Sequence, residues 1–146
     1  MITIPADIVW PALFLEQRLL SLWIILAGLI IEYFFVWRVT ELGAKRSILA
    51  DVAMNAASTL LGLILIPAFG LVVAIFPGEF VGTFSPVTWG FTFLVAVFLN
   101  ALIEFFVLRK GFNQSIGKKG FWWIWLANAL SVGIAFGSFL LYPIKE

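Results

Sequence analysis

The sequence contains no cysteine and no histidine, and only 12% of its 146 residues are charged. The chain therefore cannot form disulfides, thiolate nucleophiles or Cys/His zinc sites, and it lacks the commonest axial ligand of haem. The histidine base of most catalytic triads is also missing, and no Gly-rich phosphate-binding loop occurs. We expect no cofactor and favour a non-catalytic protein over an enzyme, while metal binding stays open.

Hydrophobic residues make up 63% of the chain. An ordinary soluble domain is about 25% charged, and a chain this short cannot hide so much apolar surface in one aqueous core. The net charge of +1 gives no general attraction to nucleic acid, so no such partner is expected. The composition predicts that the partner is a lipid bilayer.

Four apolar runs predict an all-α integral membrane protein with four transmembrane helices. Each run is near or above the roughly 20 residues that a helix needs to cross a bilayer. Polar and apolar residues do not alternate, so strands are not expected. The second run contains Pro67, which favours one kinked helix over a helix that ends near Ile66. The runs cover about residues 19–37, 48–76, 87–108 and 121–142.

The first 18 residues precede these runs and differ from them. Pro11 suits the first turn of a helix, and Glu16 and Arg18 follow an apolar stretch. Because the first basic residue is Arg18, the segment does not read as a cleaved signal peptide. We expect residues 1–18 to form an interfacial segment that lies along the membrane surface.

The connecting segments carry an orientation signal. The loop at 77–86 contains no Lys or Arg, whereas the first and third loops are basic. By the positive-inside rule the basic loops face the cytoplasm and both termini face outward, in a plasma (inner) membrane. The basic residues of these two loops are Arg38, Lys45, Arg46, Arg109, Lys110, Lys118 and Lys119. Tryptophans near the predicted boundaries, as in an aromatic belt, are Trp10, Trp37, Trp89, Trp122 and Trp123.

The chain also contains an internal repeat. The segment 31–36 (IEYFFV) matches 103–108 (IEFFVL), and 55–58 (NAAS) matches 128–131 (NALS), at offsets of 72 and 73 residues. The alternative is chance similarity between apolar segments, but the shared residues are the rare polar ones. We predict two tandem helical hairpins, 19–76 and 87–146, joined by the external loop 77–86. With two crossings each, they form parallel repeats about an axis along the membrane normal.

Polar residues inside the spans form one predicted layer. Glu32 lies six residues before Arg38, a depth of about 9 Å at 1.5 Å per residue. Ionisable groups in the membrane are costly and usually face the bundle interior. The candidates for an ion-interacting role are Glu32, Glu104, Asp51, Asn55, Asn100 and Asn128. Those for polar or close helix packing are Ser58, Ser131, Gly62, Gly133 and Gly137.

Three functions fit this pattern. The leading hypothesis is ion or small-solute permeation that uses Glu32 and Glu104 as paired carboxylates. The alternative is a non-catalytic subunit that anchors or stabilises a larger membrane complex, with the acids paired to Arg38 and Arg109. An enzyme acting on lipids is the least favoured. For either of the first two, we expect a homo-oligomer or an assembly with other membrane subunits.

Overall fold

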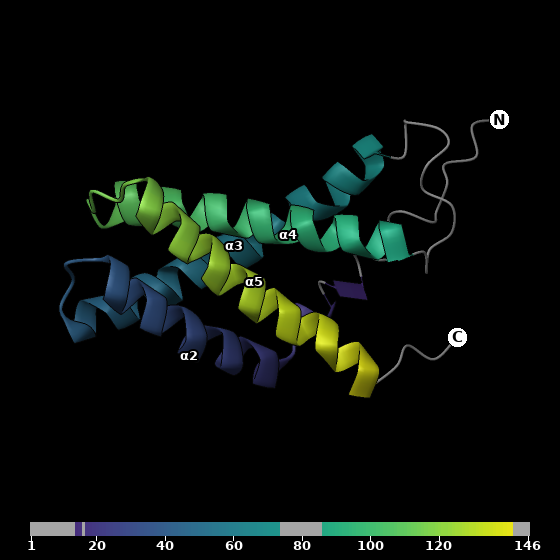
Figure 1. Cartoon of the computed structure of the whole chain (residues 1–146), viewed down its shortest axis with the longest axis horizontal. Helices are drawn as coiled ribbons and strands as arrows, with labels where there is room; N and C mark the ends of the chain where they lie inside the picture. The colour runs from purple at the N-terminus through teal and green to yellow at the C-terminus, as the bar shows by residue number, and fades with distance from the viewer. Residues whose placement is uncertain (1–13, 16, 74–85, 142–146) are drawn as a thin grey trace.

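The computed structural model describes residues 14–15, 17–73 and 86–141, and in this part of the chain all regular structure is helical. Four long helices follow one another (Figure 1). They are α2 (Leu22–Val39), α3 (Ala44–Val73), α4 (Pro86–Phe106) with the π-helical turn η1 (Val107–Gly111), and α5 (Lys118–Leu141).

All four helices are long and apolar enough to cross a membrane, which confirms the predicted all-helical class and the number of candidate spans. Their outward surfaces are strongly apolar. Leu22 and Ile30 on α2 are each 72% exposed, and Leu141 on α5 is 74% exposed. The helices therefore bury only one side against each other and leave large aliphatic side chains on the other.

The second apolar run forms one helix. α3 continues past Pro67 to Val73, which confirms one helix and not an end near Ile66, while the kink expected at Pro67 stays a prediction. Residues 74–85 lie outside the described part of the chain, as do residues 1–13 of the expected interfacial segment. Near the end of that segment, Leu15 is fully buried and packs in an apolar cluster with residues of the long helices.

The helices pack in the cyclic order α2, α3, α4, α5, so that each contacts two neighbours. In Figure 1, α2 and α4 run in one direction, while α3 and α5 return and cross them, one behind and one in front. The arrangement is an antiparallel four-helix bundle with interior-facing sides on all four helices.

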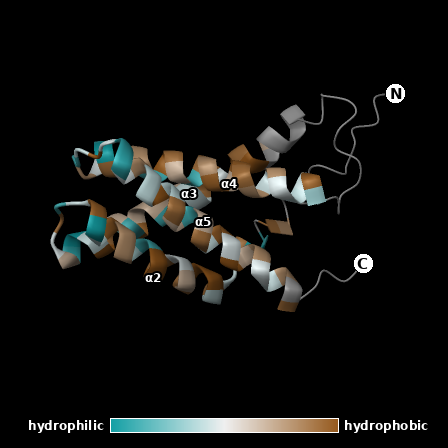
Figure 2. Ribbon diagram, in the orientation of Figure 1, coloured by the Kyte–Doolittle hydropathy of each residue, from teal (hydrophilic) through white to brown (hydrophobic). Residues whose placement is uncertain are grey.

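The first and third loops meet at one end of the bundle. The backbone N–H of Glu41 donates to Oε1 of Gln114 at 3.1 Å, which joins the two loops directly. Thr40 closes α2 by donating both its N–H and its hydroxyl to the carbonyl of Val36. Hydrophilic residues gather at this end of the bundle (Figure 2). The two basic loops therefore lie at the same end, as their charge predicted.

Two apolar clusters occupy the bundle interior. One includes Leu15, Ile24, Ile66 and Val132, and the other, toward the basic loops, includes residues of all four helices such as Val36. Glu32 on α2, Ser58 on α3, and Asn128 and Ser131 on α5 lie along their helices between residues of the two clusters. Glu104 on α4 lies beside Ala101 and Leu108, which belong to the cluster nearer the basic loops. These five residues form a polar layer in the bundle interior.

Candidate functional site

Glu32 is one of two carboxyl groups at the centre of the polar layer. It is only 3% exposed. Its Oε2 accepts a hydrogen bond from Nδ2 of Asn55 on α3 at 2.5 Å, and its Oε1 accepts one from the hydroxyl of Ser131 on α5 at 2.6 Å. Glu32 on α2 is thus joined to both helices that flank α2.

Glu104 on α4 repeats this pattern. It is 1% exposed, and its Oε2 accepts from Nδ2 of Asn128 on α5 at 2.6 Å. The hydroxyl of Ser58 on α3 donates to its Oε1 at 3.3 Å. Each glutamate therefore bonds the asparagine of its own hairpin and the serine of the other hairpin.

The supporting bonds within the helices are also matched. Asn55 donates to the carbonyl of Asp51, and Asn128 donates to the carbonyl of Ile124, both at 3.1 Å. Ser58 and Ser131 lie 3.2 Å from the carbonyl three residues earlier in their helices. Together these bonds close a ring through α2, α3, α4 and α5. The sequence predicted that these residues share one layer, but not which of them are bonded.

Neither glutamate is paired with a basic side chain within the described residues. Their hydrogen-bond partners are amides and hydroxyls, while Arg38, Arg109 and Lys110 are exposed at the loop end. The alternative of ion pairs between these acids and the loop arginines is therefore not observed. Other basic residues singled out from the sequence, Lys45, Arg46, Lys118 and Lys119, are also exposed.

Asp51 and Asn100 extend the layer in two directions. Asp51 is 3% exposed and lies one turn nearer the basic loops, where its Oδ1 is 3.3 Å from Nδ2 of Asn55. Asn100 lies one turn before Glu104 and is half-buried, and its amide oxygen is 3.7 Å from the position that a Cβ on Gly62 would take. Asn100 makes no hydrogen bond to another described residue.

The glycines divide into two groups. Gly62 is buried, and a Cβ at this position would lie 3.7 Å from the amide oxygen of Asn100, in agreement with its predicted role in close packing. A Cβ at Gly133 or Gly137 would meet no atom within 4 Å, so the close helix approach expected at these two glycines is not found in the described part of the monomer. Gly28 was not among the predicted packing residues, yet a Cβ at this position would lie 3.6 Å from Cβ of Ser131.

A cavity of about 460 Å³ opens from this polar layer. Glu32, Glu104, Asn55 and Asn128 line it, together with Asn100 and the two serines. The remaining lining is largely aliphatic and comes mostly from α2 and α3, for example Leu29 and Leu63. Gly28 contributes to this space because it places no side chain between Glu32 and the start of α2.

The described residues hold no group of three or more acidic side chains suited to a metal ion. Two carboxyl groups with amide and hydroxyl neighbours can accept a proton, and their oxygens can coordinate a singly charged cation. Divalent cations usually take six or more oxygen ligands.

Comparison with known proteins does not add to this description, since the chain matches no protein family, no curated protein and no solved structure.

Proposed function

We propose that this chain is an integral membrane protein in which Glu32 and Glu104 form a proton- or monovalent-cation-binding site used for ion or small-solute permeation. The observation that supports it most strongly is the buried carboxyl pair, which lacks a basic partner among the described residues and lines one cavity. Membrane insertion is supported by four apolar helices with exposed aliphatic side chains.

The electrostatic argument concerns the cost of buried charge. An ionised carboxylate without a partner is strongly disfavoured in a low-dielectric interior. The neighbouring amides and hydroxyls supply dipoles but no compensating positive charge. A bound proton or cation would supply that charge, and this makes the layer a binding site rather than a salt bridge.

The hydrogen-bond arrangement suits a carboxyl group that gains and loses a proton. Each serine hydroxyl has one proton but two acceptors within reach, a glutamate oxygen and a helix carbonyl. When the carboxyl is ionised, the serine donates to it. When the carboxyl is protonated, it can donate to the serine while the serine donates to the carbonyl. Both states use the same heavy-atom positions.

The cavity favours a small or partly apolar solute. Its volume of about 460 Å³ lies within the 300–1,000 Å³ typical of ligand pockets. Its walls are aliphatic beyond the polar layer, so an organic monovalent cation is accommodated as well as a bare ion. On the side toward the start of α2, the cavity is lined by Ile24, Ile25 and Leu29.

The repeat supports a paired site. The glutamates are separated by 72 residues, and the asparagines and serines by 73. Equivalent hydrogen bonds between these residues are what two parallel hairpins related about the membrane normal would produce. We propose that the chain arose by this duplication, that its basic loops face the cytoplasm, and that both termini face outward.

The competing function is a non-catalytic subunit of a membrane complex, and one observation favours it. The ring through Glu32, Asn55, Ser58, Glu104, Asn128 and Ser131 closes without any ligand. Polar networks of this kind can serve only to hold helices together. In that case the ring would stabilise the fold and no flux would depend on its charge.

Proteoliposomes separate the two functions. Proton, monovalent-metal and small-amine fluxes are measured for the wild type, Glu32→Gln and Glu104→Gln, with thermal stability recorded for each. The proposal expects at least a tenfold loss of flux in both variants without loss of fold. A second pair tests the cavity: Leu63→Trp should block flux because Leu63 lines the cavity, whereas the adjacent lipid-facing Ile64→Trp should not. Absence of wild-type flux for every solute would favour the structural subunit.

A further inference from the structure

A second, separate groove lies on the outer side of the α4–α5 hairpin, at the end that carries the basic loops. Its volume is about 340 Å³. α4 and η1 form one wall, and the start of α5 forms the other. Arg109 and Lys118 line it near the loop, and Leu102, Phe105, Phe121 and Trp122 supply its apolar surface.

Aromatic contacts fix the shape of this groove. The rings of Phe105 and Phe121 meet edge to face with centroids 5.5 Å apart, and Phe121 and Trp122 are similarly arranged at 6.0 Å. The guanidinium carbon of Arg109 lies 5.9 Å from the centroid of the Phe105 ring. This cation–π distance holds the positive charge over the apolar wall.

The π-helical turn positions the basic side of the groove. The N–H of Phe112 donates to the carbonyl of Val107 at 3.3 Å, five residues earlier, which widens the turn that carries Arg109. The chain then returns through Asn113, which has a positive φ of 55°, to Lys118 at the start of α5. Such wide turns recur at functional positions in helices.

The chemistry of the groove is that of a phosphate head joined to a hydrocarbon chain. Its lining includes two cations and no acidic residue. Arginine and lysine both bind phosphate, arginine through its planar fork. Trp122 is 62% exposed beside them, which suits the interface where lipid head groups meet acyl chains.

We propose that this groove binds one anionic phospholipid, with Arg109 and Lys118 on its phosphate and an acyl chain along Leu102, Phe105 and Trp122. Two cations without a neighbouring anion prefer a head group with net negative charge over a zwitterionic one. The site is independent of Glu32 and Glu104, which lie inside the bundle.

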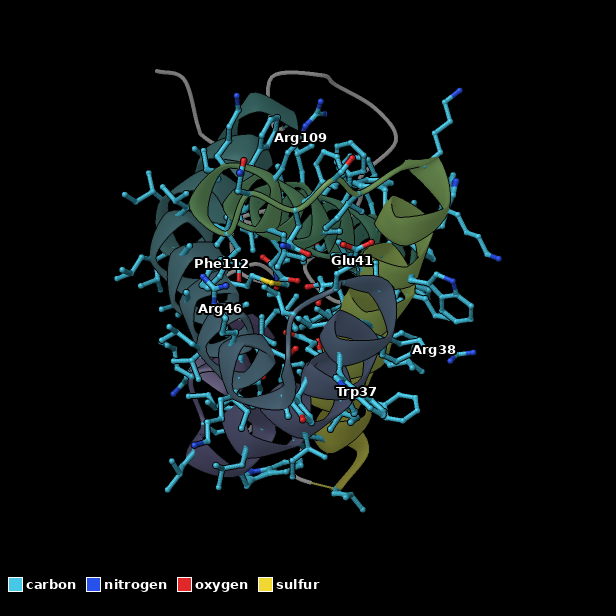
Figure 3. The ribbon with its side chains drawn as sticks, turned by 90° about the vertical axis from the view of Figure 1, so that its left-hand side faces the viewer. Trp37, Arg38, Glu41, Arg46, Arg109 and Phe112 are labelled. Carbon is cyan, nitrogen blue, oxygen red and sulfur yellow. The ribbon has the colours of Figure 1, made fainter. Side chains whose placement is uncertain are left out.

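The first hairpin offers a matched control. Arg38 and Lys45 are also exposed basic residues at the loop end, and Figure 3 shows Arg38 on a different side of that end from Arg109. Arg38 lies in the last turn of α2 and Lys45 in the first turn of α3, where no π-helical turn occurs. General attraction between positive loops and anionic lipid would involve both pairs equally, whereas the groove requires only Arg109 and Lys118.

The test is native mass spectrometry of the detergent-solubilised protein titrated with phosphatidylglycerol or phosphatidylcholine. We expect one phosphatidylglycerol to bind with at least tenfold preference over phosphatidylcholine. Arg109→Gln/Lys118→Gln should weaken that binding by roughly 10- to 30-fold, since each basic residue near an anionic head group contributes about fivefold. Arg38→Gln/Lys45→Gln should change it by less than about threefold. If the first double variant does not fold, Lys118→Gln alone should lose about fivefold.

Equal losses in the two double variants would overturn the proposal in favour of unspecific charge attraction. Equal binding of the two lipids would overturn it as well. Displacement of the lipid by millimolar glycerol phosphate would instead assign the groove to a soluble phosphate compound. Glu32→Gln should keep full phosphatidylglycerol affinity, so failure of the cation site would leave this result unaffected.

Discussion

Ser131→Ala and Ser58→Ala provide a quantitative test of the polar ring. The two serines occupy equivalent positions in the repeat, but their hydroxyls lie at different distances from the glutamates. The Ser131 hydroxyl lies 2.6 Å from Glu32, whereas the Ser58 hydroxyl lies 3.3 Å from Glu104. Both serines are at most 7% exposed and line the same cavity, so any replacement of the lost donor by water should be similar at the two sites. Removal of the shorter bond should therefore destabilise the protein more.

The expected magnitudes follow from measured polar contacts in membrane bundles. Such bonds average about 0.6 kcal/mol and reach about 1.7 kcal/mol. We expect Ser131→Ala to lower the free energy of unfolding by about 1.5 kcal/mol and Ser58→Ala by about 0.5 kcal/mol. The gain in helix propensity from serine to alanine is the same at both sites and cancels from the comparison.

Reversible unfolding in mixed micelles, followed by circular dichroism, measures both changes. Ser138→Ala is the matched control, because Ser138 is buried but its hydroxyl donates to the carbonyl of Ala135 in its own helix. It should cost less than Ser131→Ala. Equal destabilisation by all three substitutions, or a larger effect at Ser58 than at Ser131, would refute the reasoning from the ring geometry.

Three further predictions follow from the fold. Gly28→Ala should be tolerated or stabilising by up to about 1 kcal/mol in thermal unfolding, since the new Cβ would meet Ser131 at ordinary contact distance; a loss above about 1 kcal/mol would contradict this packing. The chain has no native cysteine, so single cysteines can report topology. Cysteines at the exposed positions Glu41 and Ser115 should be labelled by an impermeant thiol reagent from one side of the membrane, and a cysteine at Leu141 from the other side. Labelling of Glu41 and Ser115 from opposite sides would exclude the four-span topology. A short bifunctional thiol reagent should also join cysteines at Glu41 and Gln114, whose loops are in contact, and failure to do so would contradict that contact.

The sequence predicted the coarse features of the fold because they depend on composition and length. Four apolar runs, their helical form and the continuity through Pro67 all appear in the structure. Spacing also brought the correct polar residues into one layer, since rare Glu, Asn and Ser side chains in apolar helices must face inward.

The partners within that layer could not be derived in the same way. Pairing of each glutamate with the serine of the other hairpin depends on how α2 sits against α5 and α3 against α4. Helix periodicity gives a face but no register between helices. For the same reason Gly133 and Gly137 were predicted to allow a close helix contact, although a Cβ at either would meet no described atom within 4 Å, and Gly28 was missed. Its place four residues before Glu32 was the available signal.

Burial also changes how the loops can be probed. Ser47 lies in the sequence beside the basic residues of the first loop, yet it is fully buried and donates to the carbonyl of Leu42. A cysteine at Ser47 would therefore be inaccessible to a labelling reagent, whereas Glu41 is exposed. This residue could not be assigned as buried from the sequence because the start of α3 was expected near Ile48 rather than at Ala44.

The central claim is that Glu32 and Glu104 take up a proton or a monovalent cation inside the bundle. Infrared difference spectroscopy of the reconstituted protein measures this directly, since protonated, ionised and cation-bound carboxyl groups absorb differently. The account predicts a change in buried carboxyl absorption when pH or cation concentration is varied. The change should be reduced in Glu32→Gln and in Glu104→Gln, and smallest when both are replaced, with Asp51 as the remaining buried carboxyl of the layer. A carboxyl signal that does not respond to protons or cations, or one that responds equally in the double variant, would contradict the account.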